Sequence, residues 1–221
     1  ISTRDWSSDV CSSDLIFLFY AGAATSKDIL KIGDKGAAQW LSPSAPFKIE
    51  DEGVEYPSLE HYLAGMRVKI GGKRPDLAAS IFGREGTIHQ EFNNQRLLET
   101  NAGTRPLIEK RDQELLAMEI AKVRDAQRAP SLKKYGVVVD EAAWLTQRDA
   151  VLEEGLRQRW AKDARFRKIV EAARGLGKYL LYYTPGASTS NLGGTRSSQT
   201  GRIQGENRIG KAIMKLAGYP D

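Results

Sequence analysis

Residues 56–67 read Tyr-Pro-Ser-Leu-Glu-His-Tyr-Leu-Ala-Gly-Met-Arg, and this stretch decides the fold. Pro57 disfavours helix in the residue before it, and the Ser58 hydroxyl can accept hydrogen bonds from backbone N–H groups that follow. A helix is therefore predicted to begin at about Leu59. Apolar side chains recur along it at intervals of three and four residues, which predicts burial along one face: Leu59, Tyr62, Leu63, Met66 and Ile70.

Glu60 does not lie on that apolar face. On a helical wheel it shares an edge with Ala64 and Arg67, so its carboxylate points past a small side chain toward a cation two turns on. This edge could be the wall of a pocket. Alternatively, Glu60 is a first-turn acid favoured by the helix dipole and Arg67 is a solvated side chain. Spacing alone leaves both interpretations open.

The length and composition indicate one ordinary globular domain. The 221 residues suffice for a single core, and contents of 41% hydrophobic and 28% charged residues are typical of such proteins. No apolar run approaches the roughly 20 residues that cross a bilayer, so membrane association is not expected. Residues 1–15 show neither periodicity nor a signal-peptide pattern. They look like a translated adapter sequence, and we expect them to be disordered and exclude them from the fold.

Excluding residues 1–15 removes the only cysteine and raises the net charge of the remaining chain. Cys11 is that cysteine, so neither a disulfide framework nor thiol chemistry is expected. With His61 and His89 as the only histidines, no zinc site of the usual ligand types is expected either. The segment carries a net charge of −2, so the total of +5 leaves +7 for the remainder. A basic domain favours anionic partners, either phosphates or nucleic acid.

The remaining chain alternates short apolar runs with helical patterns. Strands are predicted at 16–20, 47–49, 135–139 and 178–184, and helices at 59–70, from Asp140 onward, at 157–174 with a break near Asp163, and from Asn207. The region 75–128 is charged and mostly helical in pattern. Residues 124–134 contain Pro130 and several basic residues and are predicted to form a loop.

A loop rich in Ser, Thr and Gly occupies residues 187–205. Its glycines at 193 and 194 and its arginines at 196 and 202 could bring backbone N–H groups and guanidiniums to a phosphate. The helix after it would add a favourable N-terminus. The loop lacks the Gly-Lys-Ser/Thr ending of a P-loop, so it can also be an ordinary connection.

Elimination leaves carboxylate chemistry as the main catalytic option. No Ser-His-Asp arrangement is readable, whereas Glu60 has basic and aromatic neighbours that suit activation of a water against a glycosidic carbon. His61 adjoins Glu60 and is a candidate for the same site. A lone histidine on a helix is, however, more often structural.

The run Tyr56–Tyr62 resembles the signature of the NADAR family, also called YbiA-like, which reads aromatic-Pro-Ser/Thr-x-Glu-His-Tyr. Four further patches resemble the family in the same order along residues 16–217. They are Phe17-Leu18-Phe19-Tyr20; Leu41-Ser42; Trp144 with a basic residue four later, Arg148; and Gly205-Glu206-Asn207-Arg208-Ile209-Gly210 through Met214.

The resemblance implies an α+β, mainly helical single domain over residues 16–221, with a small β-sheet and a charged helical insertion at about 75–134. It implies a hydrolase that cleaves an N-glycosidic bond of an ADP-ribose or ribose-phosphate compound, such as ADP-ribosylated guanine or a riboflavin-pathway ribosylamine. ADP-ribosylated DNA or nucleotides would be its partners. No cofactor and no metal are implied, the oligomeric state stays open, and we expect a cytoplasmic protein.

The resemblance also assigns residues. Glu60 would be the catalytic carboxylate, Trp144 would line the base or ribose pocket, and Asn207 and Arg208 would orient ribose or phosphate. The other substrate-binding residues that we predict are Arg148, Arg67, His61, Tyr62, Ser42, Gly193 and Gly194.

Departures from the family pattern keep other functions open. Arg67 stands where many members have lysine, and it cannot supply a neutral amine. Asn191-Leu192-Gly193-Gly194 replaces Asp-x-x-Trp-Gly, and Pro43 replaces the usual asparagine. The substrate could therefore differ. The chain could also hold ADP-ribose or NAD without cleaving it, or bind nucleic acid through the arginine-rich helix 157–174.

Overall fold

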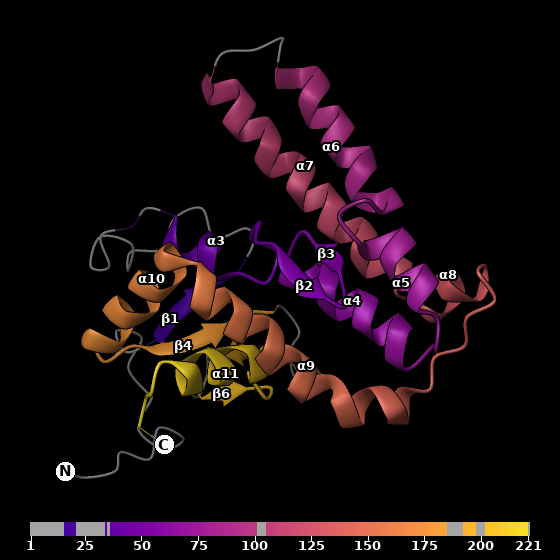
Figure 1. Cartoon of the computed structure of the whole chain (residues 1–221). Helices are drawn as coiled ribbons and strands as arrows, with labels where there is room; N and C mark the ends of the chain where they lie inside the picture. The colour runs from indigo at the N-terminus through magenta and orange to yellow at the C-terminus, as the bar shows by residue number, and fades with distance from the viewer. Residues whose placement is uncertain are drawn as a thin grey trace. The chain divides into compact units, whose positions relative to one another are not determined.

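The computed structural model describes residues 16–20, 34, 36–100, 105–184, 192–197 and 202–220, with only the backbone described at 99–100 and 105–110 (Figure 1). The chain divides into two compact units. The first unit comprises residues 1–45 and 156–221, and the second comprises residues 46–155. The prediction for residues 1–15 lies outside the described residues, and the single domain over 16–221 stays a prediction.

A parallel pair of strands lies at the centre of the first unit. β1 (Ile16–Phe19) pairs with β4 (Tyr179–Tyr182), with Ile16 opposite Tyr179 and Phe19 opposite Tyr182. Both predicted strands are thus confirmed. Nearly every residue of the pair is buried, as expected for parallel strands covered by helices. The covering helices are α3 (Ala37–Leu41) on β1, and α10 (Ala164–Gly175) and α11 (Arg208–Leu216) on β4.

The predicted break near Asp163 separates α9 (Glu141–Lys162) from α10. Asp163 caps α10 by accepting from the Phe166 N–H at 2.9 Å, and it accepts from the Trp40 indole at 2.8 Å. The buried Arg159 guanidinium lies 3.3 Å from the same carboxylate and donates to the Ser42 carbonyl at 3.1 Å. Burial lowers the pKa of Arg159 to about 10. These partners offset the free-energy cost of burying the charged guanidinium.

The second unit begins with a hairpin. β2 (Ile49–Asp51) and β3 (Val54–Tyr56) are antiparallel and joined by Glu52 and Gly53, which both have positive φ. Such two-residue turns match the twist of the flanking strands. The strand predicted at 47–49 therefore lies two residues further along, because the turn takes only Glu52 and Gly53 and leaves Glu50 and Asp51 in the strand.

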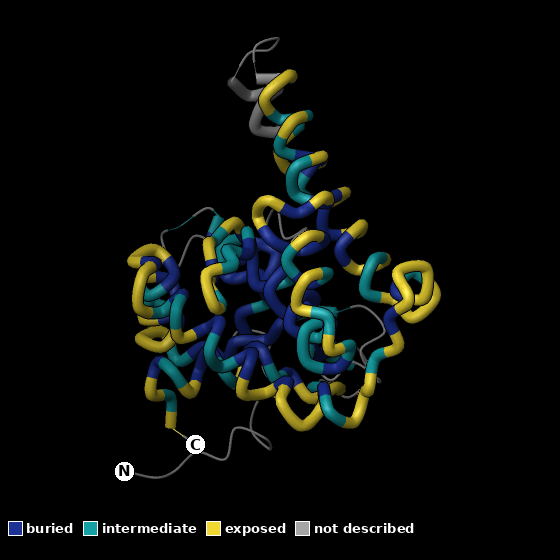
Figure 2. The backbone as a smooth tube through the Cα atoms, turned by 45° about the vertical axis from the view of Figure 1, so that its right-hand side comes forward, coloured by how far each residue is buried: buried dark blue, intermediate teal, exposed yellow. Residues whose placement is uncertain are grey.

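The helix that follows is α4 (Leu59–Ile70), as predicted, and the Ser58 hydroxyl accepts from the His61 N–H at 3.4 Å. The charged region after it is helical, also as predicted: α5 (Pro75–Phe82), α6 (Thr87–Thr100), α7 (Arg105–Ala126) and α8 (Ala129–Lys133). α6 and α7 pack side by side as an antiparallel hairpin whose exposure increases with distance from α4 (Figure 2).

Two predictions in this region are wrong. Residues 124–134 are not a loop, because α7 continues to Ala126 and Pro130 lies in the first turn of α8. A proline there costs little, since the first N–H groups of a helix have no partner within it. Residues 135–139 are not a strand: Tyr135 and Gly136 form a turn, and the next residues have no strand partner among those described.

α9 starts where predicted, since Asp140 accepts from the Ala143 N–H at 3.0 Å. Trp144, Arg148 and Val151 are buried, whereas Leu145 is 49% exposed. The first unit also contains a minimal hairpin, β5 (Thr195–Arg196) and β6 (Ile203–Gln204). The fold is therefore α+β, mainly helical with small sheets. None of its described helices combines the length and the apolar character that a bilayer crossing requires.

Candidate functional site

Glu60 occupies the first turn of α4, and its side chain is only 14% exposed. One carboxylate oxygen, Oε1, accepts from both the Nε and the Nη2 of Arg124 on α7, with Nε at 3.1 Å. The other oxygen, Oε2, has no partner among the described residues. Arg124 therefore fixes Oε1, and Oε2 is available to orient a water.

Arg67, on the same edge of α4, is held by other groups. It donates to the carbonyl of Gln127 and pairs with Glu141 in the first turn of α9. Its side chain is 16% exposed. Arg67 thus connects α4 to the segments at the end of α7 and the start of α9, and the cation that contacts Glu60 is Arg124.

Asp140, just before α9, and Gly155, near its end, contact opposite ends of α4 within the second unit. At one end, the Asp140 N–H donates to the Gly71 carbonyl at 2.9 Å. At the other end, a Cβ on Gly155 would lie 2.7 Å from Leu59 Cδ1 and 3.0 Å from Tyr62. The contacts lie at opposite ends of α4, and a side chain at position 155 would require Leu59 or Tyr62 to shift.

Trp144 and Arg148 lie on the face of α9 that Gly155 shares, because they precede it by about three and about two helical turns. Trp144 is 6% and Arg148 is 7% exposed. Arg148 Nε lies 3.3 Å from Asp149 Oδ1, while its two terminal nitrogens have no partner in the described chain. A buried guanidinium with unpaired terminal nitrogens is suited to hold an anionic oxygen pair.

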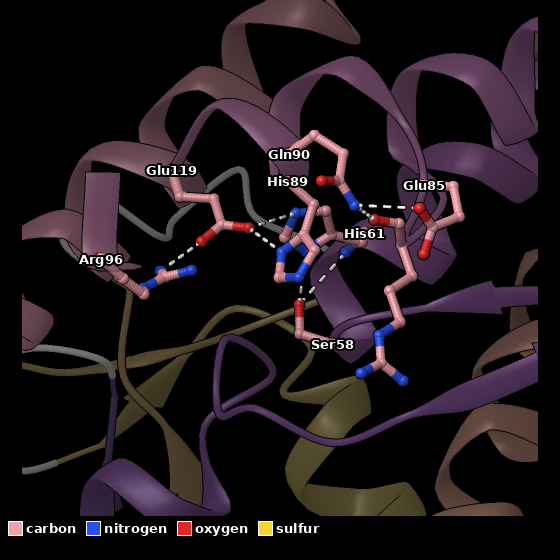
Figure 3. Close-up of polar contacts among 8 residues, drawn as sticks. Ser58, His61, Glu85, His89, Gln90, Arg96 and Glu119 are labelled. Atoms are coloured by element: carbon pink, nitrogen blue, oxygen red, sulfur yellow. Dashed lines mark hydrogen bonds and ion pairs between the residues drawn. The ribbon is translucent and has the colours of Figure 1, made fainter. Parts of the chain in front are cut away.

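His61 and Tyr62 point into the interior of the second unit. Tyr62 is 2% exposed, and its ring meets that of Tyr56 edge-on at 5.6 Å between centroids. His61 is 1% exposed; its Nδ1 lies 2.8 Å from Ser58 Oγ, and its Nε2 lies 3.2 Å from Glu119 Oε1 (Figure 3).

Glu119 contacts His61 and was not predicted from the sequence. It is buried, its Oε1 lies 2.7 Å from His89 Nδ1, and its Oε2 accepts from Arg96 (Figure 3). Burial alone would raise the pKa of Glu119, but the close approach of the His61 and His89 rings to its carboxylate holds it well below its usual range. The available signal was its position four residues after Leu115 and four before Val123, which places a carboxylate on the apolar face of a helix.

Among the predicted site residues of the first unit, Ser42 follows α3, and Gly193 and Gly194 lie beside the end of β4. Ser42 is buried and its hydroxyl lies 2.7 Å from that of Ser44. The Gly194 N–H donates to the Tyr182 carbonyl at 2.9 Å, and a Cβ on Gly193 would lie 2.1 Å from Thr184 Oγ1. Much of the predicted phosphate loop, at 185–191 and 198–201, lies outside the described residues.

Asn207 precedes α11 with φ of +48° and does not cap the helix with its side chain. Its Oδ1 accepts from the Tyr182 N–H at 3.0 Å, and its Nδ2 donates to the Leu180 carbonyl at 2.8 Å and to the Tyr179 hydroxyl at 3.2 Å. The amide thus fixes α11 to β4. Arg208 pairs with Glu206. A substrate-binding role for these two residues stays a prediction.

The predicted site residues therefore divide between the units. Glu60, His61, Tyr62, Arg67, Trp144 and Arg148 belong to the second, whereas Ser42, Gly193, Gly194, Asn207 and Arg208 belong to the first. A comparison of the chain with protein-family models, curated proteins and solved structures finds no match. The function must therefore be argued from the residues of each unit.

Proposed function

We propose that the protein is a hydrolase that cleaves the N-glycosidic bond of an ADP-ribose or ribose-phosphate compound, with Glu60 as its catalytic carboxylate. The observation that carries the proposal is the environment of Glu60. Its side chain is largely buried, Arg124 fixes one oxygen, and the other oxygen is without a partner among the described residues.

Cleavage of an N-glycoside proceeds through an oxocarbenium-like centre. Glu60 Oε2 would accept a proton from a water as the water oxygen bonds to the anomeric carbon. The C–N bond breaks, and its electron pair leaves with the base, which then takes a proton from solvent. The negative charge of Glu60 would also stabilise the cationic centre, and Arg124 prevents the carboxylate from turning away.

Two residues of α9 supply the rest of the site in this proposal. The Trp144 ring would hold the leaving base, and the terminal nitrogens of Arg148 would hold a phosphate. Both are buried on α9, about three and two helical turns before Gly155, which contacts the first turn of α4 at Leu59; their approach to Glu60 stays a prediction. The resemblance of residues 56–62 to the NADAR signature supports the same assignment, and with it a YbiA-like fold. Participation of Asn207 and Arg208 in this pocket stays a prediction.

The arginine-rich stretch 157–174 favours nucleic-acid binding less than its composition suggests. Arg159 is buried, Arg165 pairs with Asp34 at 2.7 Å, and Arg167 donates to the carbonyls at the end of α9. Arg174 donates to the Ala217 carbonyl at 2.9 Å. Arginine side chains that already bind protein groups are not available to neutralise phosphates. The hydrolase is therefore the function that we propose.

The test is to incubate the purified full chain with ADP-ribosylated guanine DNA, NAD and a ribosylamine phosphate, and to measure released base. Glu60→Gln should abolish release while ligand affinity, measured by calorimetry, persists. Glu114→Gln, an exposed acid on α7, is the matched control and should leave the rate unchanged. Binding without release in the native chain would instead establish a binding module, and salt-sensitive binding to unmodified DNA a nucleic-acid-binding protein.

A further inference from the structure

Three side chains from three helices of the second unit meet beneath the first turn of α4. They are His61 of α4, His89 of α6 and Glu119 of α7, and one ligand atom from each lies within 4.8 Å of the others (Figure 3). His61 and Glu119 are each 1% exposed, and the His89 side chain is 16% exposed. Imidazole nitrogens and a carboxylate oxygen are the ligands of many zinc and other transition-metal sites.

A second observation concerns the buried Nε2 of His61. It lies 3.2 Å from Glu119 Oε1 but makes no well-oriented hydrogen bond to any described residue. At the other side of the ring, Nδ1 is 2.8 Å from Ser58 Oγ. If Nδ1–H donates to Ser58, the lone pair of Nε2 faces a carboxylate oxygen. Two acceptors at this distance then need a proton or a metal ion between them, whereas in the other tautomer Nε2–H itself faces the carboxylate.

We propose that His61 Nε2, His89 Nδ1 and Glu119 Oε1 bind a divalent transition-metal ion, with Zn²⁺ the best fit. Bonds of about 2.0–2.1 Å in a tetrahedral site place ligand atoms about 3.3 Å apart. The Nε2–Oε1 distance of 3.2 Å already matches, and the His89–Glu119 distance of 2.7 Å requires a small separation. Three protein ligands leave a fourth position for water.

Two of the three ligand residues have outer hydrogen-bond partners, as the ligands of metal sites usually do. Ser58 holds the far nitrogen of His61 and so fixes the ring, and Arg96 holds the second oxygen of Glu119. Such outer partners orient the ligands. The ion would join α4, α6 and α7. The two histidines and the single cysteine of the sequence predict no zinc site, and the third ligand is a carboxylate from the region 75–134. The metal site does not depend on the proposed activity.

The test uses the full chain, stripped with a chelator and titrated with Zn²⁺ or Co²⁺. We expect one ion per chain, a rise in Tm on Zn²⁺ addition, and the visible absorption of tetrahedral Co²⁺. His89→Gln changes a partly exposed side chain and should weaken binding by about tenfold or more. Glu91→Gln, an exposed acid on the same helix, is the matched control and should bind as the native chain does.

X-ray absorption of the zinc-loaded native chain needs no variant and should show two imidazole nitrogens and oxygen ligands. Failure of the native chain to bind either ion, or equal affinity in His89→Gln, would overturn the proposal. The cluster would then be a hydrogen-bonded network in which a proton, instead of a metal, lies between His61 and Glu119. A zinc spectrum with a different ligand set would overturn it equally.

Discussion

Arg124 binds Glu60 through a single carboxylate oxygen, with Nε 3.1 Å from Oε1 and Nη2 on the same atom. An arginine that only neutralised a carboxylate would be expected to bridge both oxygens, which is the common geometry of such pairs. Here the pairing fixes the direction of the carboxylate and leaves Oε2 available. In the proposed reaction Arg124 is therefore a positioning residue.

Arg124→Gln should lower kcat by roughly 10- to 100-fold with little change in KM, because a misplaced base slows the chemical step more than it weakens binding. Glu60→Gln should lower kcat further. Arg124→Lys keeps a charge on α7 and should recover part of the loss. Steady-state kinetics on the best substrate of the release assay measure these effects. A loss confined to KM would contradict the positioning role.

Arg148→Ala should weaken binding of phosphate-bearing ligands by roughly 10- to 100-fold, since hydrogen bonds to charged groups contribute about 1.5–3 kcal/mol. Binding of the corresponding unphosphorylated nucleoside should change little. The matched control is Arg128→Ala, which removes an exposed guanidinium from the same unit. Calorimetry with ADP-ribose and with adenosine gives both affinities. Equal losses for the two ligands would show that Arg148 only supports the fold.

Tyr56 makes stability pH-dependent at the alkaline end. Its side chain is buried beside Gly65, and burial raises the pKa of its hydroxyl to about 12. The unfolded chain loses this proton near pH 10, whereas the folded chain keeps it. The contribution is thus complete below about pH 10 and is lost as the pH rises toward 12. At about 1.4 kcal/mol per pKa unit, the loss is at most about 3 kcal/mol.

Urea unfolding at a series of pH values from 8 to about 12 measures this loss. Tyr56→Phe should unfold with a shallower pH dependence than the native chain over that interval, because other groups titrate in both proteins. Parallel curves for the two proteins would show that Tyr56 ionises as freely in the folded state as in the unfolded one.

Local signals predicted the helix starts correctly. Ser58, Asp140 and Asp163 each accept from a backbone N–H three residues later, which is a contact that the sequence alone specifies. The strand predicted at 135–139 was wrong because strand formation depends on distant residues as well as on local sequence. Its valines have the right composition, but a strand also needs a partner, and no described strand pairs with it.

The candidate sites needed contacts between distant residues. Glu60 itself was predictable from its place on the helix, whereas its partner Arg124 lies 64 residues away in a segment expected to be a loop. The same holds for Glu119, whose histidine partners belong to α4 and α6. Asn207 was assigned correctly to the start of a helix, but its bonds to β4 depend on tertiary packing.

Gly155→Ala tests the packing on which the proposed site depends. The new Cβ would lie 2.7 Å from Leu59 Cδ1 and 3.0 Å from the Tyr62 ring, so the Leu59 side chain or α9 must shift near the first turn that carries Glu60. Overpacking of this kind costs about 1–3 kcal/mol. Gly175→Ala is the matched control, because its Cβ meets nothing within 4 Å. We expect a lower Tm and slower base release only for Gly155→Ala, and equal Tm values for both variants would show that the two helices adjust without cost.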